Sequence, residues 1–247
     1  MPSSKVILVT GSNAGIGYEL VHLLAAKGHT VYLASRKEAS GLEAVAKIKK
    51  EKNLDVKFVQ LDVTDLASVE AAATKINQTE GRLDVLVNNA GIAEFAPDMS
   101  VTKPNLAAIR ATIDTNLFGL IQTTTAFLPL LRAAAAPAAP AVVLNVSTDM
   151  ASNTFMASPK GLLHEALAYN TSKAAANAYT VALAHELAAE HIRVNAITPG
   201  FTTTKLNGFA PGGKTPEQGA LMMVKWCLLD KDGPTGKFAY DSGEWPW

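Results

Sequence analysis

A tyrosine and a lysine stand four residues apart in the segment Tyr169-Asn-Thr-Ser-Lys173. Four residues make about one helical turn, so on a helix the two side chains would lie on the same face. A phenol has an unperturbed pKa of about 10, and a nearby ammonium lowers that pKa because it stabilises the phenolate. The pair therefore predicts proton transfer at the Tyr169 oxygen, although such pairs are also frequent by chance in helices.

Three glycines, Gly11, Gly15 and Gly17, lie between an apolar run and a helical pattern in Thr10-Gly-Ser-Asn-Ala-Gly-Ile-Gly17. Gly11 would permit a tight turn, Gly15 a close approach of the backbone to a pyrophosphate, and Gly17 close packing of helix on strand. The amide groups and dipole of a helix N-terminus favour an anion. The spacing predicts a dinucleotide site, but a structural turn with a small-residue packing contact would also produce it.

The end of the second expected strand distinguishes between nicotinamide cofactors. A carboxylate there would bind the ribose 2′-hydroxyl of NAD and repel a 2′-phosphate. This chain has Ser35-Arg36-Lys37 instead. Arg36 can bind a phosphate through two N–H groups and Ser35 can donate to it, which favours NADP(H) over NAD(H). A solvated arginine at a strand end is the alternative.

The elements that position these residues follow a regular alternation. Strands are expected at residues 5–10, 30–34, 56–61, 83–87, 141–146, 192–198 and 236–240, and helices at 15–27, 41–50, 66–78, 106–131, 169–190 and 216–229. Alternating strands and helices predict a parallel sheet with helices on both faces, which binds ligands at the carboxyl ends of its strands. We therefore expect an α/β fold: one Rossmann-type, doubly wound domain over residues 1–247, with about seven strands and the last at the sheet edge.

Composition limits the function classes. The 247 residues are 48% hydrophobic and 18% charged, with 22 basic and 22 acidic residues, so the formal net charge is zero. This composition excludes a disordered chain and argues against nucleic-acid binding. A single cysteine, Cys227, cannot form an internal disulfide and suggests a reducing compartment, with an inert thiol on a hydrophobic helix.

Targeting, membrane and metal signals are weak. The five histidines show no paired ligand spacing, so no metal site is expected. The N-terminus has no signal-peptide pattern, and the longest apolar run, at residues 128–144, is interrupted by Arg132 and three prolines. A soluble, cytoplasmic protein that binds no membrane is the expectation.

Taken together, Thr10-Gly-x-x-x-Gly-x-Gly17, Asn88-Asn-Ala-Gly91, Asn116, Ser147-Thr148, Tyr169-x-x-x-Lys173 and Pro199-Gly200 resemble the short-chain dehydrogenase/reductase family over nearly the whole chain. The segment before Tyr169 and the ending 233–247 are similar to the carbonyl-reductase-like branch. The resemblance implies hydride transfer between nicotinamide and a carbonyl compound or secondary alcohol.

The resemblance also implies catalytic roles. Tyr169 would donate the proton to the carbonyl oxygen, Lys173 would lower the Tyr169 pKa and hold the nicotinamide ribose, and Asn116 would anchor a water that relays protons to Lys173. A hydroxyl after the fifth strand would polarise the substrate oxygen. The family usually has two serines there; alignment by the strand selects Thr148, with Ser147 in reserve. Tyr169 follows Thr148 by 21 residues, which is longer than usual and indicates an insertion.

Cofactor contacts are expected along the carboxyl edge of the sheet. Asp62 could reach the adenine, small residues at 88–91 would let the cofactor lie against the sheet, and residues 199–204 would fix the carboxamide. The full expected set is Gly11, Asn13, Gly15, Ile16, Gly17, Ser35, Arg36, Asp62, Val63, Asn88, Ala90, Gly91, Tyr169, Lys173, Pro199, Gly200, Thr202 and Thr204.

Two loops are expected to bind a small-molecule carbonyl or alcohol substrate: residues 150–168, and residues 201–216 as a lid. Apolar side chains in the first loop suggest an apolar ketone or aldehyde, although they could equally pack the loop down; they are Met150, Phe155, Met156, Leu162 and Leu163. His164 is a candidate polar contact.

Three matters stay open at the sequence level. The chain could be an NADP(H)-binding sensor without turnover, which would keep the glycines and lose Tyr169 or Lys173, or an isomerising or dehydrating relative. It could be a monomer or a homo-oligomer, dimer or tetramer. The substrate, its stereochemistry and the reaction direction cannot be read from the sequence.

Overall fold

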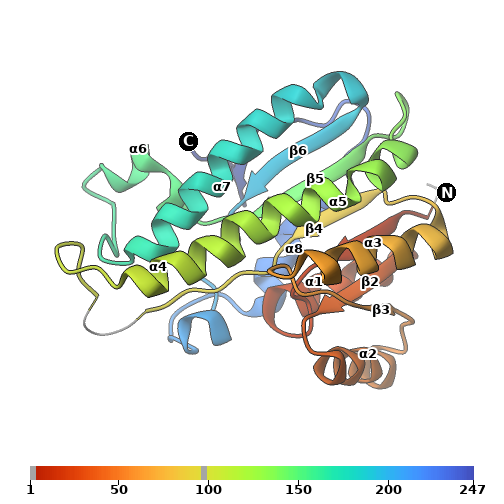
Figure 1. Ribbon diagram of the computed structural model, residues 1–247, viewed down its shortest axis with the longest axis horizontal. Helices are drawn as coiled ribbons and strands as arrows, with labels where there is room; N and C mark the ends of the chain where they lie inside the picture. Colours follow the sequence, from red (N-terminus) through yellow and green to blue (C-terminus); the bar gives the residue numbers. More distant parts are fainter. Residues whose placement is uncertain (1–3, 96–98) are drawn as a thin grey trace.

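The computed structural model describes residues 4–95 and 99–247, and its sheet has the strand order β3-β2-β1-β4-β5-β6-β7-β8 (Figure 1). The strands are β1 Val6–Val9, β2 Thr30–Ser35, β3 Lys57–Gln60, β4 Val85–Asn88, β5 Ala141–Val146, β6 Ile192–Ile197, β7 Phe238–Tyr240 and β8 Gly243–Glu244. The helices are α1 Gly15–Ala25, α2 Glu38–Lys52, α3 Leu66–Glu80, α4 Leu106–Ile113, α5 Gly119–Ala134, α6 Asn153–Met156, α7 Leu167–Glu186 and α8 Pro216–Cys227. All strand pairs except β7–β8 are parallel, which confirms the expected doubly wound α/β fold.

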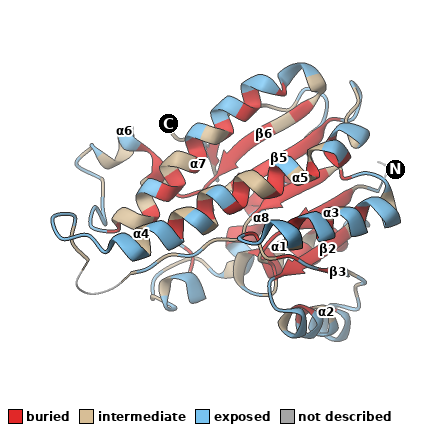
Figure 2. Cartoon of the chain, viewed as in Figure 1, coloured by how far each residue is buried: buried red, intermediate tan, exposed pale blue. Residues whose placement is uncertain are grey.

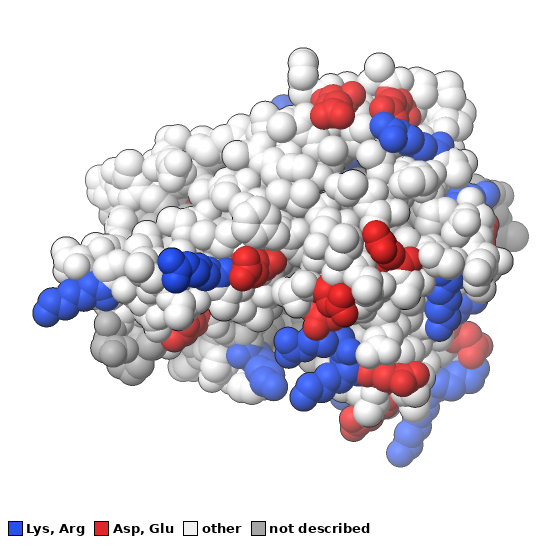
Figure 3. All heavy atoms as spheres, viewed as in Figure 1, with Lys and Arg blue, Asp and Glu red and all other residues white. Residues whose placement is uncertain are grey.

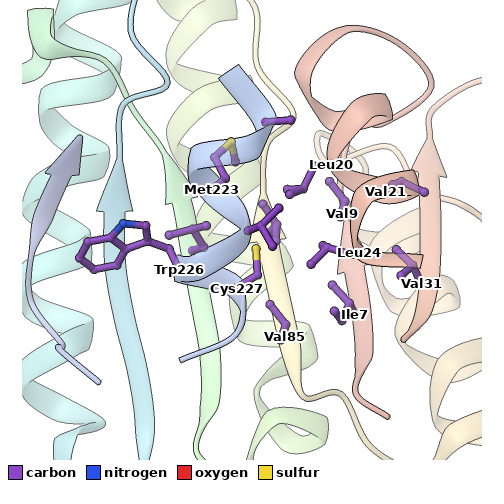
Figure 4. Close-up of a cluster of buried hydrophobic side chains, with 14 of the residues drawn as sticks. Ile7, Val9, Leu20, Val21, Leu24, Val31, Val85, Met223, Trp226 and Cys227 are labelled. Carbon is purple, nitrogen blue, oxygen red and sulfur yellow. The ribbon is translucent and has the colours of Figure 1, made fainter. Parts of the chain in front are cut away.

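Helices cover both faces of this sheet because its strands are apolar on both faces (Figures 1 and 2). Along β1, Ile7 and Val9 belong to the cluster under α1 and α8, whereas Val6 and Leu8 belong to the cluster under α3, α5 and α7. This alternation follows from the period of two in an extended strand. Figure 4 shows side chains of α1 and α8 meeting over β1 in the first cluster.

Cys227 lies in the cluster between α1 and α8 and is fully buried. Burial raises the pKa of its thiol, which keeps the sulfur protonated and unreactive. The thiol therefore acts as a small apolar side chain of the core, as the sequence suggested.

The far edge of the sheet differs from the expectation. The segment at residues 236–240 is not the edge, because β8 adds to β7 in the antiparallel direction through a two-residue turn. The sheet therefore has eight strands instead of about seven. A strand of two residues, Gly243–Glu244, is too short to produce a period that sequence patterning can detect.

The helix expected at residues 106–131 contains a change of helix type in its middle. Its α-helical parts, α4 and α5, are joined by one π-helical turn at Asp114–Phe118, which contains Asn116. Single π turns inside α-helices are rare and are frequent at functional sites. The turn widens the helix where it passes α7.

By length and hydropathy, Leu106–Ala134 is the one helical stretch among the described residues that could cross a membrane. Phe127 and Leu131 of this stretch are nonetheless fully buried in the cluster under α3, α5 and α7. It is therefore a covering helix of the sheet. On the molecular face shown in Figure 3, basic and acidic side chains alternate, without a large area of one sign.

Candidate active site

The carboxyl ends of the central strands form the candidate site. β1 pairs with β2 on one side and with β4 on the other, so the chain reverses its direction of winding between β1 and β4. Ligands of doubly wound sheets bind at such a point.

The loop after β1 is bonded to the segment after β4. Thr10 Oγ1 accepts from the backbone N–H groups of Asn89 and Ala90, both at 3.0 Å. Asn89 Nδ2 donates to the carbonyl oxygens of Thr10 and Gly11 at 2.8 and 3.1 Å. A Cβ on Gly11, whose φ is +58°, would lie 2.8 Å from Ala90 Cα. The two loops therefore form one rigid unit that tolerates only glycine at position 11.

The N-terminus of α1 has the donor set that a diphosphate requires. Ala14 precedes the helix without a side-chain cap, no acidic residue lies in the first turn, and the N–H groups of Gly15, Ile16 and Gly17 donate to no described residue. A Cβ on Gly15, whose φ is +61°, would have Thr204 as its nearest neighbour, at 3.7 Å. Free N–H groups at a helix N-terminus bind anionic groups, so the loop fits the phosphates of a dinucleotide.

Gly17 is constrained by packing. A Cβ there would lie 2.5 Å from Asn89 Nδ2 and 2.9 Å from Ser12 Cα. Ser12 itself accepts from Ala34 N–H at 3.0 Å and donates to the Val9 carbonyl at 2.7 Å. The third glycine therefore lets α1 approach the strand ends, the role that its spacing predicted.

Tyr169 lies in the first turn of α7 with 8% of its surface exposed. Its ring packs edge-on against Phe95, with the ring centroids 5.7 Å apart. Burial raises the pKa of the Tyr169 hydroxyl well above its ordinary value, and the negative charge of Asp149 raises it further. The side chains of this protein thus hold the phenol in its protonated form, the form that can donate a proton.

Lys173 lies one turn further along α7 and is also buried. Its Nζ donates to the carbonyl oxygen of Val146, the last residue of β5, at 2.7 Å. Burial lowers the pKa of Lys173 to about 8. The expected lowering of the Tyr169 pKa by Lys173 does not result, because desolvation disfavours the charged form of both groups and Asp149 adds to the effect on Tyr169.

The side chain of Asn116 in the π turn connects the segment after β4 to α7. Its Oδ1 accepts from Ile92 N–H at 2.9 Å, and its Nδ2 donates to the Ile92 carbonyl and to Ser172 Oγ at 2.9 and 3.0 Å. A Cβ on Gly91 would lie 3.2 Å from Asn116 Oδ1 and 3.6 Å from Lys173 Nζ. Gly91, Asn116 and Lys173 are therefore brought together; the water relay expected at Asn116 stays a prediction.

The two hydroxyls after β5 have different surroundings. Ser147 Oγ donates to Asn177 Oδ1 of α7 at 2.7 Å, deep in the fold. Thr148 lies where the chain leaves the sheet, and its Oγ1 donates to Asp149 Oδ1 at 3.0 Å. The Thr148 hydroxyl is thus bonded at the start of the expected substrate loop and that of Ser147 inside the fold; the assignment of Thr148 as the catalytic hydroxyl stays a prediction.

Of the residues at the ends of β2 and β3 that are expected to contact the cofactor, Arg36 has the side chain most accessible to a ligand. Arg36 is exposed and its guanidinium makes no hydrogen bond to a described residue. Ser35, in contrast, is buried, and its hydroxyl donates to the Lys37 carbonyl at 2.8 Å. The expected donation from Ser35 to a phosphate stays a prediction, which requires this bond to be exchanged. Asp62 accepts from Thr64, and Val63 packs against Gly119.

Asn88 and the segment 199–204 complete the expected set. Asn88 Nδ2 donates into the sheet, to Thr124 Oγ1 and Asn145 Oδ1, so its side chain supports the fold. Gly200 has a φ of +74°, and Thr202 Oγ1 donates to the Gly200 carbonyl at 3.1 Å. Thr204 reaches the glycine loop, which brings the expected lid beside the expected phosphate site. Asn13, Ala90 and Pro199 lie in the same loops, and Ile16 lies in the first turn of α1.

The long loop before Tyr169 is packed down by aromatic contacts. Phe155 of α6 packs edge-on against Trp245, with centroids 4.7 Å apart, and Thr154 Oγ1 donates to the Trp247 carbonyl. His164 bonds the Met156 carbonyl at 2.9 Å, so its ring holds the loop together. Leu162 and Leu163 are exposed.

Comparison with known proteins decides the family. A family model described as short chain dehydrogenase matches residues 5–212. The chain is 33% identical to (-)-isopiperitenone reductase of Mentha piperita and 31% identical to (+)-neomenthol dehydrogenase of Capsicum annuum, with 95% and 96% of both chains covered in the respective pairs. The chain belongs to the short-chain dehydrogenase family. It is therefore an oxidoreductase of a family that uses nicotinamide cofactors on carbonyl compounds and alcohols.

Solved structures of short-chain dehydrogenases share this fold. NADPH-bound carbonyl reductase from chicken fatty liver is 28% identical, with a TM-score of 0.85 and 99% of both chains covered. Salutaridine reductase of Papaver somniferum is 29% identical, with a TM-score of 0.81 over 96% of this chain and 99% of that chain.

Sequence reasoning missed four residues of this short-chain dehydrogenase site: Asn89, Phe95, Asp149 and Asn177. Asn177 follows Tyr169 and Lys173 at the same spacing of four, a helical period that could have revealed it. Asn89 lies inside a motif that was recognised, but its bonds to Thr10 and Gly11 depend on the neighbouring strand. Phe95 and Asp149 carry no sequence signal, since their roles depend only on position.

We expect Gly11→Ala to destabilise the fold by more than Gly81→Ala. Both glycines have positive φ, at +58° and +68°, so each alanine costs about 1–2 kcal/mol of backbone strain. Around Gly81 nothing lies within 4 Å, whereas Gly11 abuts Ala90, and overpacking there adds about 1–3 kcal/mol. Urea unfolding of the two variants measures the difference; equal losses would show that the loop contact is not tight.

Proposed function

We propose that this protein is an NADPH-dependent reductase that transfers a hydride to a ketone or aldehyde, with Tyr169 as the proton donor. One observation carries the proposal: the buried, protonated phenol of Tyr169 lies one helical turn from the buried Lys173. Both lie at the carboxyl ends of the strands, where the N-terminus of α1 has no side-chain cap. The NADPH-bound carbonyl reductase among its structural relatives supports the same reaction.

The cofactor would be held by three parts of the sheet edge. The free N–H groups of Gly15 to Gly17 would bind the diphosphate, and residues 88–91 would face the ribose and nicotinamide. The segment Pro199–Thr204 would close over the nicotinamide from the lid side. When bound, NADPH supplies the hydride.

Side chains of this protein would supply the proton for the carbonyl oxygen and would polarise the carbonyl group. Tyr169 would release its proton to the carbonyl oxygen as that oxygen gains negative charge. The Thr148 hydroxyl would donate a second hydrogen bond to the same oxygen. Lys173, with its pKa lowered to about 8, would hold a ribose hydroxyl and return a proton to Tyr169 after each turnover, with Asn116 anchoring the water of that relay.

The substrate would enter between the loops 150–168 and 201–216. The ring of Phe95 gives this space an apolar group in contact with Tyr169. A cytoplasmic location is part of the proposal, supported by Cys227, which is buried and unpaired. The same evidence is neutral between a monomer and a homo-oligomer.

We expect Tyr169→Phe to reduce kcat by about 100-fold or more, because general acid catalysis contributes about that much. NADPH affinity should stay within a few-fold, which fluorescence titration measures. Tyr179→Phe, which removes a phenol hydroxyl elsewhere on the same helix, is the matched control and should retain turnover. Full activity of Tyr169→Phe would reject the mechanism; tight NADPH binding by the wild type with no turnover of any carbonyl would identify a sensor.

Thr148→Ala and Ser147→Ala should separate in their effects. Loss of a hydrogen bond to the charged oxygen in Thr148→Ala should lower kcat about 100-fold. Ser147→Ala leaves Asn177 buried without its donor, so it should cost about 1–3 kcal/mol of stability and little of kcat. Steady-state kinetics and thermal unfolding of both variants test the assignment, and the reverse pattern would make Ser147 the catalytic hydroxyl.

Arg36→Ala should weaken NADPH binding by about 10–100-fold, because a hydrogen bond to a charged group contributes about 1.5–3 kcal/mol. NADH binding should hardly change, since NADH has no 2′-phosphate. Lys37→Ala is the neighbouring control. Parallel losses for NADPH and NADH in Arg36→Ala would contradict the assigned contact.

A further inference from the structure

Asp149 lies next to Thr148, on a short helical turn that contacts α7, the helix of Tyr169. It directly follows Thr148 and begins the short helical turn Asp149–Ala151 at the carboxyl end of β5. It is half-buried, and it is close enough to Tyr169 to act on the phenol electrostatically. A carboxylate at this position is adjacent to both groups that would bond the carbonyl oxygen.

The Asp149 carboxylate has hydrogen bonds but no countercharge. Its Oδ1 accepts from Thr148 Oγ1 and from Met150 N–H, both at 3.0 Å. Over residues 4–95 and 99–247, no lysine, arginine or histidine forms an ion pair with Asp149. The cation of the site, Lys173, donates instead to the Val146 carbonyl.

This arrangement works against a neutral substrate in two ways. A threonine hydroxyl has one proton, and Thr148 directs that proton to Asp149. A carbonyl oxygen that gains negative charge during reduction would also lie close to an anion, which disfavours the charge. A neutral ketone therefore has to displace the Thr148–Asp149 hydrogen bond without compensation.

A positive charge on the substrate removes both obstacles. A protonated amine beside Asp149 would pair with the carboxylate and leave the Thr148 proton free to bond the carbonyl oxygen. The setting favours such a pair, because the ring of Phe95, which packs against Tyr169, also attracts cations.

We propose that Asp149 determines substrate specificity and selects carbonyl compounds that carry a positively charged nitrogen. This inference rests on the proposed reductase function and narrows its substrate class. Asp149 acts here through the charge of the substrate and through the hydroxyl proton of Thr148.

The test compares two ketones of nearly equal shape. One is 1-methyl-4-piperidone in its protonated form, and the other is 4-methylcyclohexanone. We expect the wild-type protein to reduce the cationic ketone with the higher kcat/KM. In Asp149→Asn, which keeps an acceptor for Thr148 and Met150, the ratio of the two kcat/KM values should fall about tenfold or more, equivalent to about 1.4 kcal/mol. Added salt should lower the wild-type ratio in the same direction.

Glu43→Gln removes one negative charge from the exposed face of α2, far from the site, and is the control for net charge. Its ratio should equal that of the wild type. An unchanged ratio of the kcat/KM values in Asp149→Asn, or equal decreases of kcat/KM for both ketones, would overturn the proposed role of Asp149. Either result would leave the reductase function standing. Absence of NADPH oxidation by the wild type with either ketone or any other carbonyl would overturn the reductase function as well.

Discussion

The close contact between the loop after β1 and the segment after β4 is the constraint on which the site depends. Thr10 and Asn89 exchange hydrogen bonds across the point where the sheet reverses its winding, and Gly11 lies against Ala90 without room for a side chain. This contact fixes the N-terminus of α1 relative to β4. Because Gly91 follows on the same segment and adjoins Asn116 and Lys173, the proposed phosphate loop and the proposed catalytic groups share one rigid frame.

Burial determines the protonation of the proposed catalytic pair. Tyr169 and Lys173 are both removed from water, so each is displaced toward its neutral form: the phenol keeps its proton, and the pKa of the lysine falls to about 8. A pair prepared in this way suits carbonyl reduction, which consumes a proton at the phenol oxygen. Asp149 shifts the balance in the same direction and also gives the substrate side a negative charge.

Polar groups inside the fold support this frame. Asn88, Asn145 and Thr180 form a hydrogen-bonded row across β4, β5 and α7, and Ser147 bonds Asn177 in the next turn of the same helix. Such buried bonds are costly to break and fix the orientation of α7 on the sheet. The position of Tyr169 above the strand ends therefore depends on these buried hydrogen bonds.

The sequence by itself determined the order of strands and helices, the parallel sheet, the glycine loop and the Tyr169–Lys173 spacing, because each of these is a local pattern of period, turn chemistry or helical repeat. Only the tertiary structure decided how the side chains use their hydrogen bonds. It directs the Ser35 hydroxyl to the Lys37 carbonyl and the Ser147 hydroxyl to Asn177. It also places Asn116 in a π turn and adds β8 to the sheet. It also reversed the expected shift of the Tyr169 pKa, since desolvation and the charge of Asp149 depend on how the chain is packed and leave no trace in residue spacing.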